Sequence, residues 1–274
     1  MIRGYESIAF NTAPDSENQI HSDDMAQRFG FQGGLVPGVT VSAYLIQPAV
    51  EAWGDAFYHR GAAHVQIRKP TYHDEPFRVA VTAASESQFE SQLLNPEGTI
   101  NGVATVTLDD QEVSLGLPVF RDDPLMPEGY RGAPASEARF QLLKNEGCLA
   151  QEFHFDASNP RTWYFKSAEL MPKLHQVTDK SVRAFAHASF ILGCGNWVFA
   201  NNAFMNPWVH METRHRHFAP ILDGDTVRVE MRVVDWFERK GHAFADVDVS
   251  LFDAKTHAAR VSIHQRAIYR LRGN

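Results

Sequence analysis

The sequence predicts an α+β protein built from two similar units in tandem. Two long apolar segments have the pattern of buried helices, and each is followed by a series of strand-like segments. Short stretches that lie 150 residues apart resemble each other, and a segment rich in proline, glycine and charge separates the two halves. One helix beside several antiparallel strands, occurring twice, favours two α+β units over a parallel sheet of alternating strands and helices.

The predicted helices span about residues 38–53 and 181–199. The first is apolar on nearly every face, as expected of a buried helix rather than a surface helix. In the second, Asp179 or Ser181 could cap the start. His187 would then lie inside this helix, where we expect a core histidine with one hydrogen-bonded ring nitrogen.

Strand-like segments follow each predicted helix. They alternate apolar and polar side chains, which is typical of half-buried antiparallel strands. Four follow the first helix and four follow the second: 63–69, 77–89, 100–108 and 113–120, then 208–218, 226–238, 243–252 and 259–271. We therefore expect an antiparallel sheet around each helix.

The internal repeat is clearest where residues 70–79 align with residues 220–229. In both stretches a proline ends one strand, an acidic turn follows, and Arg-Val begins the next strand. Self-similarity at a fixed spacing indicates a duplicated structural unit.

We expect an N-terminal unit at 1–120 and a C-terminal unit at 147–274. The segment 121–146 between them, rich in proline, glycine and charge, is predicted to be a linker with a helical turn near 136–143.

Composition narrows the class of protein. The chain has 274 residues and a formal charge of −7, so we do not expect nucleic acid as a partner, because phosphate backbones are bound by dense lysine and arginine. Cys148 and Cys194 are too few for a disulfide framework. The sequence shows no secretory signal and no apolar run long enough to span a membrane, which predicts a cytoplasmic protein without a membrane partner.

The segment most specific for function runs from residue 18 to residue 38. Residues 18–23 read Asn-Gln-Ile-His-Ser-Asp, and the glycine-rich stretch 29–38 then leads into the first helix. This order resembles the hydratase segment of MaoC-like dehydratases, S-G-D-x-N-P-[IL]-H-x-D, then A-x-x-x-G-F, then a glycine that opens the central helix of a hotdog fold. The matching positions are Asn18, Ile20, His21, Asp23, Ala26, Gly30, Phe31 and Gly38.

The resemblance, taken with the repeat, implies a double hotdog, in which two units in one chain mimic the homodimer of single-unit relatives. It implies a hydratase or dehydratase acting on 2-enoyl or 3-hydroxyacyl thioesters of coenzyme A or acyl carrier protein, in fatty acid metabolism. No metal or redox cofactor is expected, and the protein could be a monomer or a homodimer. The cations available for coenzyme A phosphates are Arg60, Arg68, Lys69, Arg78, Arg214, Arg216 and Arg228.

The resemblance also assigns roles. His21 would be the catalytic acid and base, because an imidazole titrates near neutral pH. Gly38 would offer a backbone N–H to the thioester oxygen at a helix N-terminus, with Val39 and Gly33 as neighbouring substrate-binding positions. Asn18 would orient the loop or the substrate.

The sequence departs from the family pattern at the catalytic aspartate, which falls on Ser16, and at a proline, which falls on Gln19. A serine cannot replace a carboxylate base of matched pKa. Asp15 is adjacent and could take over after a one-residue shift in the loop, whereas Asp23 and Glu17 are weaker substitutes. The simpler alternative is that His21 only hydrogen-bonds within its loop.

Two other functions stay open. A hotdog thioesterase would need a carboxylate aimed at the thioester from a helix, and Glu51 and Asp179 are the candidates. The loss of the family aspartate is also compatible with a non-catalytic double hotdog that binds acyl thioesters.

Three histidines in one predicted strand, His210, His215 and His217, could suggest a metal site. His215 and His217 should share one strand face, whereas His210 has the opposite parity and should point away. Because no cysteine or acidic ligand lies at a supporting spacing, we expect half-exposed strand residues and no zinc.

Overall fold

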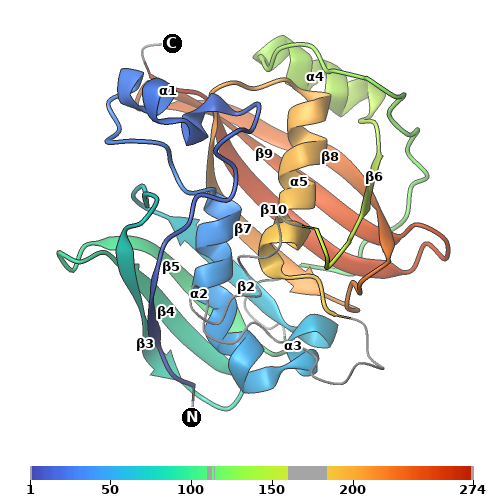
Figure 1. The fold of residues 1–274 in the computed structure, drawn as a ribbon. Helices are drawn as coiled ribbons and strands as arrows, with labels where there is room; N and C mark the ends of the chain where they lie inside the picture. The colour runs from blue at the N-terminus through green and yellow to red at the C-terminus, as the bar shows by residue number, and fades with distance from the viewer. Residues whose placement is uncertain (1, 110–112, 114, 160–183, 273–274) are drawn as a thin grey trace.

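The computed structural model describes residues 2–109, 113, 115–159 and 184–272 (Figure 1). Its strands form one ten-stranded antiparallel sheet in the order β1-β3-β4-β5-β2-β7-β10-β9-β8-β6. In the first half of the sheet the strands are β1 (Tyr5–Ile8), β2 (Ala62–Ile67), β3 (Pro76–Ala84), β4 (Gln88–Leu94) and β5 (Ile100–Thr107). In the second half they are β6 (Gln151–His154), β7 (Val209–His217), β8 (Thr226–Arg239), β9 (His242–Asp253) and β10 (Ala259–Arg270).

The helices are also divided between the two halves. The 3-10 turn η1 (Gln19–His21) and α1 (Asp23–Arg28) precede α2 (Gly38–Trp53) and α3 (Asp55–Arg60), whereas α4 (Glu137–Glu146) precedes α5 (Ala188–Asn202). Helices α2 and α5 lie side by side on one face of the sheet (Figure 1), and the hydroxyls of Thr40 and Ser189 are 3.2 Å apart between them. No helix within the described ranges is both long and apolar enough to cross a membrane.

The two halves have the same topology, which explains the repeat. Strand order β1-β3-β4-β5-β2 in the first half corresponds to β6-β8-β9-β10-β7 in the second. The halves join through antiparallel pairing of β2 with β7, and at the centre of this pairing His64 lies opposite Arg214, its counterpart 150 residues later. Isolated bridges join Leu35 to Tyr72 and, 150 residues further on, Phe185 to Leu222. The predicted α+β duplication is therefore confirmed; the unit limits 1–120 and 147–274 stay a prediction.

Several predicted elements differ in the structure. The predicted strand 77–89 is the β3–β4 hairpin, because the polar stretch 85–87 turns the chain. The described residues of segment 113–120, which was predicted to be a strand, form no strand. They run along the second half instead, where Arg216 donates a hydrogen bond to the Leu115 carbonyl and the Ser262 hydroxyl donates to the Gly116 carbonyl.

The second central helix starts later than predicted. Helix α5 begins at Ala188, and His187 is its N-cap, with a side chain that accepts a hydrogen bond from the Phe190 amide. The prediction that His187 lies inside the helix is therefore wrong. The proposed caps, Asp179 and Ser181, lie outside the described residues. The start at residue 188 matches the start of α2 at residue 38, so the repeat locates this end better than the apolar pattern did.

The predicted linker is more ordered than a plain connection. The helical turn predicted near 136–143 is the helix α4. Its N-cap is Ser136, whose side chain accepts a hydrogen bond from the Arg139 amide. Its buried Phe140 packs against Trp236 and Tyr269 of the second half.

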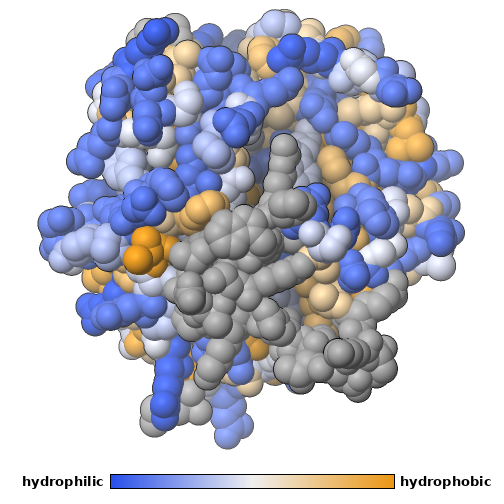
Figure 2. Space-filling model, in the orientation of Figure 1, coloured by the Kyte–Doolittle hydropathy of each residue, from blue (hydrophilic) through white to orange (hydrophobic). Residues whose placement is uncertain are grey.

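The face of the molecule drawn in Figure 2 is mainly hydrophilic, with scattered apolar residues.

Candidate active site

A cavity of about 220 Å³ lies at the N-terminus of α2, with walls from both halves of the chain. Its apolar lining includes Ile20, Phe31, Leu35, Val41, Ile67, Trp208, Met211, Ile268 and Leu271. Its polar lining comprises Asn18, His21, Arg68, Lys69, Thr71, Asn196, His210 and His242. In the part of the chain that the structure describes, no aspartate or glutamate lines this cavity. An apolar pocket with few polar groups is typical of a site for a small organic ligand.

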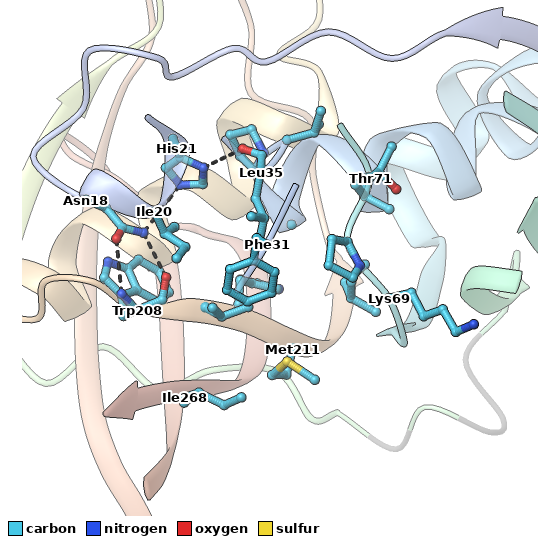
Figure 3. A pocket seen from close by; sticks show the side chains of 18 of the residues that line it. Asn18, Ile20, His21, Phe31, Leu35, Lys69, Thr71, Trp208, Met211 and Ile268 are labelled. Atoms are coloured by element: carbon cyan, nitrogen blue, oxygen red, sulfur yellow. Dashed lines mark hydrogen bonds between the residues drawn. The ribbon is translucent and has the colours of Figure 1, made fainter. Parts of the chain in front are cut away.

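His21 ends the 3-10 turn η1, and its ring lies between the side chain of Asn18 and the carbonyl of Leu35 (Figure 3). Its Nδ1 lies 2.7 Å from the Leu35 carbonyl oxygen, and because a carbonyl only accepts, Nδ1 must carry the proton. Nε2 is then unprotonated and lies 3.3 Å from the side-chain nitrogen of Asn18. Burial lowers the pKa of His21 below its usual value. The ring is therefore a neutral base whose lone pair is on Nε2.

The orientation of Asn18 is set by the second half of the chain. Its Nδ2 donates to the Trp208 carbonyl at 2.9 Å, and its Oδ1 accepts from the Trp208 amide at 3.1 Å. These two bonds distinguish the amide oxygen from the nitrogen, so a donor and not an acceptor faces His21 Nε2. Asn18 thus joins the loop of the first half to the backbone of the second half; that it orients the loop or the substrate stays a prediction.

The N-terminus of α2 supplies backbone donors at the cavity. The amides of Thr40 and Val41 bond to the Pro37 carbonyl, which leaves the Gly38 and Val39 amides without an acceptor within the described ranges. Gly38 lines the cavity, whereas buried Val39 does not. Unpaired N–H groups at a helix start favour a partial negative charge there.

The structure corrects the prediction that His210 points away from the other strand histidines. Strand β7 has a bulge at Met211: Arg266 pairs with Glu212, but the next residue, Ala267, pairs with His210. A bulge inserts one residue and reverses the alternation beyond it. His210 is therefore buried on the inner face, where its ring packs so closely on Gly38 that a Cβ there would lie 2.9 Å from the His210 Cβ.

His215 and His217 do share a face, but they are fully buried and not half-exposed as predicted. Their rings pack edge to face at 5.2 Å, next to Phe57. None of their four ring nitrogens has a hydrogen-bond partner among the described residues. Desolvation lowers the pKa of both, that of His215 to about 4. Within the described chain no group of His, Cys, Asp or Glu side chains could hold a metal ion.

The other predicted site residues lie outside the cavity lining. Asp15 is exposed. The hydroxyl of Ser16 donates to the Asn18 carbonyl, so it supports the loop backbone. Asp23 opens α1 and accepts a hydrogen bond from the Gly34 amide at 2.7 Å, while Gly33 lies next to its carboxylate. Neither Asp15 nor Ser16 thus lines the cavity.

Among the lining residues from the second half, Asn196, Trp208 and His210 make contacts that place other groups of the site, and the sequence assigned them no such role. A signal existed only for Asn196, because a polar amide in the middle of an apolar helix is unfavourable without a specific contact. Trp208 acts through its backbone, which no side-chain pattern reveals.

Comparison with known proteins agrees with the fold. No protein-family model and no curated protein matches the sequence. A protein from Mycobacterium tuberculosis described as a double hotdog has a TM-score of 0.61 at 8% identity, covering 98% of this chain and 96% of that one. A MaoC-like dehydratase has a TM-score of 0.55 at 11% identity, covering 99% and 98%. A proposed oleoyl thioesterase from Lactobacillus plantarum has a TM-score of 0.51 at 8% identity, covering 98% and 96%.

The chain is thus a hotdog-fold protein, and its duplicated sheet and paired central helices make it a double hotdog.

Proposed function

We propose that this double hotdog is a hydro-lyase that adds water to 2-enoyl thioesters or removes it from 3-hydroxyacyl thioesters. The observation that carries the proposal is His21: a neutral imidazole, with Nδ1–H bound to a carbonyl and a basic Nε2, in the wall of an apolar cavity beside a helix N-terminus. The structural similarity to a MaoC-like dehydratase supports this class of reaction.

The proposed hydration uses His21 twice. A water molecule replaces the 3.3 Å hydrogen bond from Asn18 at Nε2, and Nε2 takes a proton from this water while the water oxygen bonds to C3 of the enoyl group. The electrons of the C2=C3 bond then form an enolate, whose oxygen accepts a hydrogen bond from the Gly38 amide and is stabilised by the helix dipole. Nε2–H finally gives its proton to C2, which restores both the thioester carbonyl and neutral His21. One imidazole can serve both transfers, so the proposal needs neither Asp15 nor Ser16.

The charged carrier would bind at Arg68 and Lys69. Of the cations considered from the sequence, these two line the cavity, and both are exposed. The others are engaged elsewhere or lie apart: Arg60 pairs with Asp109, Arg214 with Glu212 and Arg228 with Asp122. Phosphate groups of coenzyme A or of a phosphopantetheine arm are the chemistry that such a pair suits.

The thioesterase alternative has less support. Its candidate Glu51 is exposed near the C-terminal end of α2 and does not line the cavity. Asp179 lies outside the described residues. Structural similarity to a proposed thioesterase keeps hydrolysis as an outcome that the assay must detect.

Incubation with crotonyl-CoA and with butyryl-CoA tests the proposal. Loss of enoyl absorbance without free thiol is the expected result, and free thiol would indicate hydrolysis instead. Short acyl groups come first, because the cavity is small, about 220 Å³. No turnover of either thioester, nor of longer homologues, would contradict the proposal and favour a non-catalytic binding protein.

A further inference from the structure

Helix α5 of the second half presents one carboxamide to the cavity. Asn196 lies in the middle of α5 and lines the cavity. Its Oδ1 is engaged twice, by Gln265 Nε2 at 2.8 Å and by His210 Nδ1 at 3.0 Å. Its Nδ2 has no acceptor among the residues that the structure describes. The two donors on Oδ1 fix the orientation of the amide and leave the NH₂ group available.

The residues around Asn196 form a polar network in an otherwise apolar wall. The Thr213 hydroxyl is hydrogen-bonded to His210 Nε2, so both ring nitrogens of His210 are occupied. Because Nδ1 donates to Asn196, Nε2 must accept from Thr213 while the ring is neutral, and desolvation favours that form by lowering the pKa of His210 to about 4. The network thus holds Asn196 from strands β7 and β10.

Two features of the backbone allow this network to form, and the network leaves one buried oxygen without a hydrogen bond. The bulge at Met211 turns His210 inward, as bulges near functional sites often re-aim a side chain. Gly195 leaves room for Gln265, since a Cβ there would lie 3.0 Å from Gln265 Oε1. That oxygen is buried without a hydrogen-bond partner in the described chain. A buried polar group left unpaired is unfavourable, so its retention points to a requirement for this arrangement.

We propose that Asn196 is a substrate-binding residue whose Nδ2 donates a hydrogen bond to the oxygen on C3 of the acyl group, with His210 and Gln265 as positioning residues. This inference rests on the proposed function. His210 packs on Gly38, so Asn196 lies one imidazole away from the helix start that would bind the thioester oxygen. The next oxygen along a 3-hydroxyacyl thioester is the 3-hydroxyl, and the same donor would hold the water that adds to C3.

The test compares two ligands that differ only in this oxygen, 3-hydroxybutyryl-CoA (each enantiomer) and butyryl-CoA. Dissociation constants are measured by calorimetry in a His21→Ala background, in which turnover is strongly slowed. One hydrogen bond should give one enantiomer of 3-hydroxybutyryl-CoA a roughly three- to tenfold tighter binding than butyryl-CoA. Asn196→Leu, which removes the donor at similar volume, should abolish this preference and leave butyryl-CoA within about twofold.

Asn196→Ala provides a second variant in case leucine disturbs the helix, because alanine is the best helix former. Asn201→Leu is the matched control: it lies on the same helix but outside the cavity lining, and should retain the preference. A preference that persists in both Asn196 variants, or its absence in the His21→Ala parent, would overturn this inference alone. Failure of both thioesters to bind the parent would overturn it together with the proposed function.

Discussion

Asn18 and Trp208 are 190 residues apart in the chain, yet the side-chain amide of Asn18 makes two hydrogen bonds with the backbone of Trp208. The same amide nitrogen lies next to Nε2 of His21. The second half of the double hotdog therefore determines how a loop of the first half presents its histidine to the cavity. Activity should depend on contacts between the halves as well as on the loop itself.

Asn18→Asp should shift the pH dependence of turnover. In the wild type, burial lowers the pKa of His21, so the base stays neutral at mildly acidic pH and kcat/KM should fall only as the pH drops through that lowered pKa. A carboxylate beside Nε2 favours the imidazolium and raises the pKa. The acid limb of the kcat/KM profile should then move to higher pH. Asn206→Asp, which adds the same charge next to Gln19 but outside the cavity lining, should leave the limb in place.

His21→Ala should reduce turnover of the enoyl thioester by roughly 10²–10⁴, the usual effect of removing a positioned acid and base. Its unfolding free energy should fall by only about 1 kcal/mol, for the lost hydrogen bond to Leu35. His59→Ala is the control, because His59 is exposed on α3 and does not line the cavity. Undiminished turnover in His21→Ala would end the proposed mechanism.

Gly38→Ala should destabilise the protein through His210. The added Cβ would lie 2.9 to 3.1 Å from three atoms of the His210 side chain, which is closer than normal packing allows. We expect a loss of roughly 1–3 kcal/mol in unfolding free energy, together with reduced activity. In a His210→Gly background, which removes all three atoms, the same substitution should cost less, so a double-mutant cycle should give a coupling of roughly 0.5–3 kcal/mol. Additive effects would show that the two residues do not interact as the structure has them.

The buried histidines predict sensitivity to acid. In the folded protein the pKa of His215 is lowered to about 4, whereas an unfolded histidine has its ordinary value of about 6.5. Between these values the unfolded chain binds a proton that the folded chain does not, so stability is lost as the pH falls from about 6.5 toward 4.

His215→Leu should therefore flatten the pH dependence of unfolding, by up to about 3 kcal/mol at the acid end. Denaturant melts at several pH values between 4.5 and 8 measure the effect. His154→Leu, at an exposed position on β6, controls for the loss of a histidine as such. If the unfolding free energy of His215→Leu depends on pH as steeply as that of the wild type, the lowered pKa of buried His215 would be contradicted.

Neutralising the cations at the cavity should weaken substrate binding without changing the chemical step. Arg68→Ala and Lys69→Ala should each raise KM for a coenzyme A thioester while kcat stays near the wild-type value, and the difference should shrink at high salt. Arg78→Ala removes an exposed cation of the first half that does not line the cavity. An equal rise in KM for all three variants would indicate a general charge effect instead of a carrier site.

The sequence by itself determined the duplicated α+β architecture and the position of the first central helix. Residues 70–79 and 220–229 resemble each other because each forms the same acidic turn between strands, and the helix starts at 38 and 188 keep the same spacing of 150. That His21 and Gly38 lie at the same cavity could also be predicted, since loop and helix start are close in the chain and local sequence largely determines both.

Only the tertiary structure decided which atoms face the cavity. The bulge at Met211 turned His210 inward against simple alternation, because strand parity depends on how β7 pairs with β10 and not on β7 alone. The tautomer of His21 depends on the Leu35 carbonyl, and the orientation of Asn18 depends on the backbone of Trp208. These contacts join segments up to 190 residues apart, and hydrogen bonds to a distant backbone leave no periodic signal in the residues that make them.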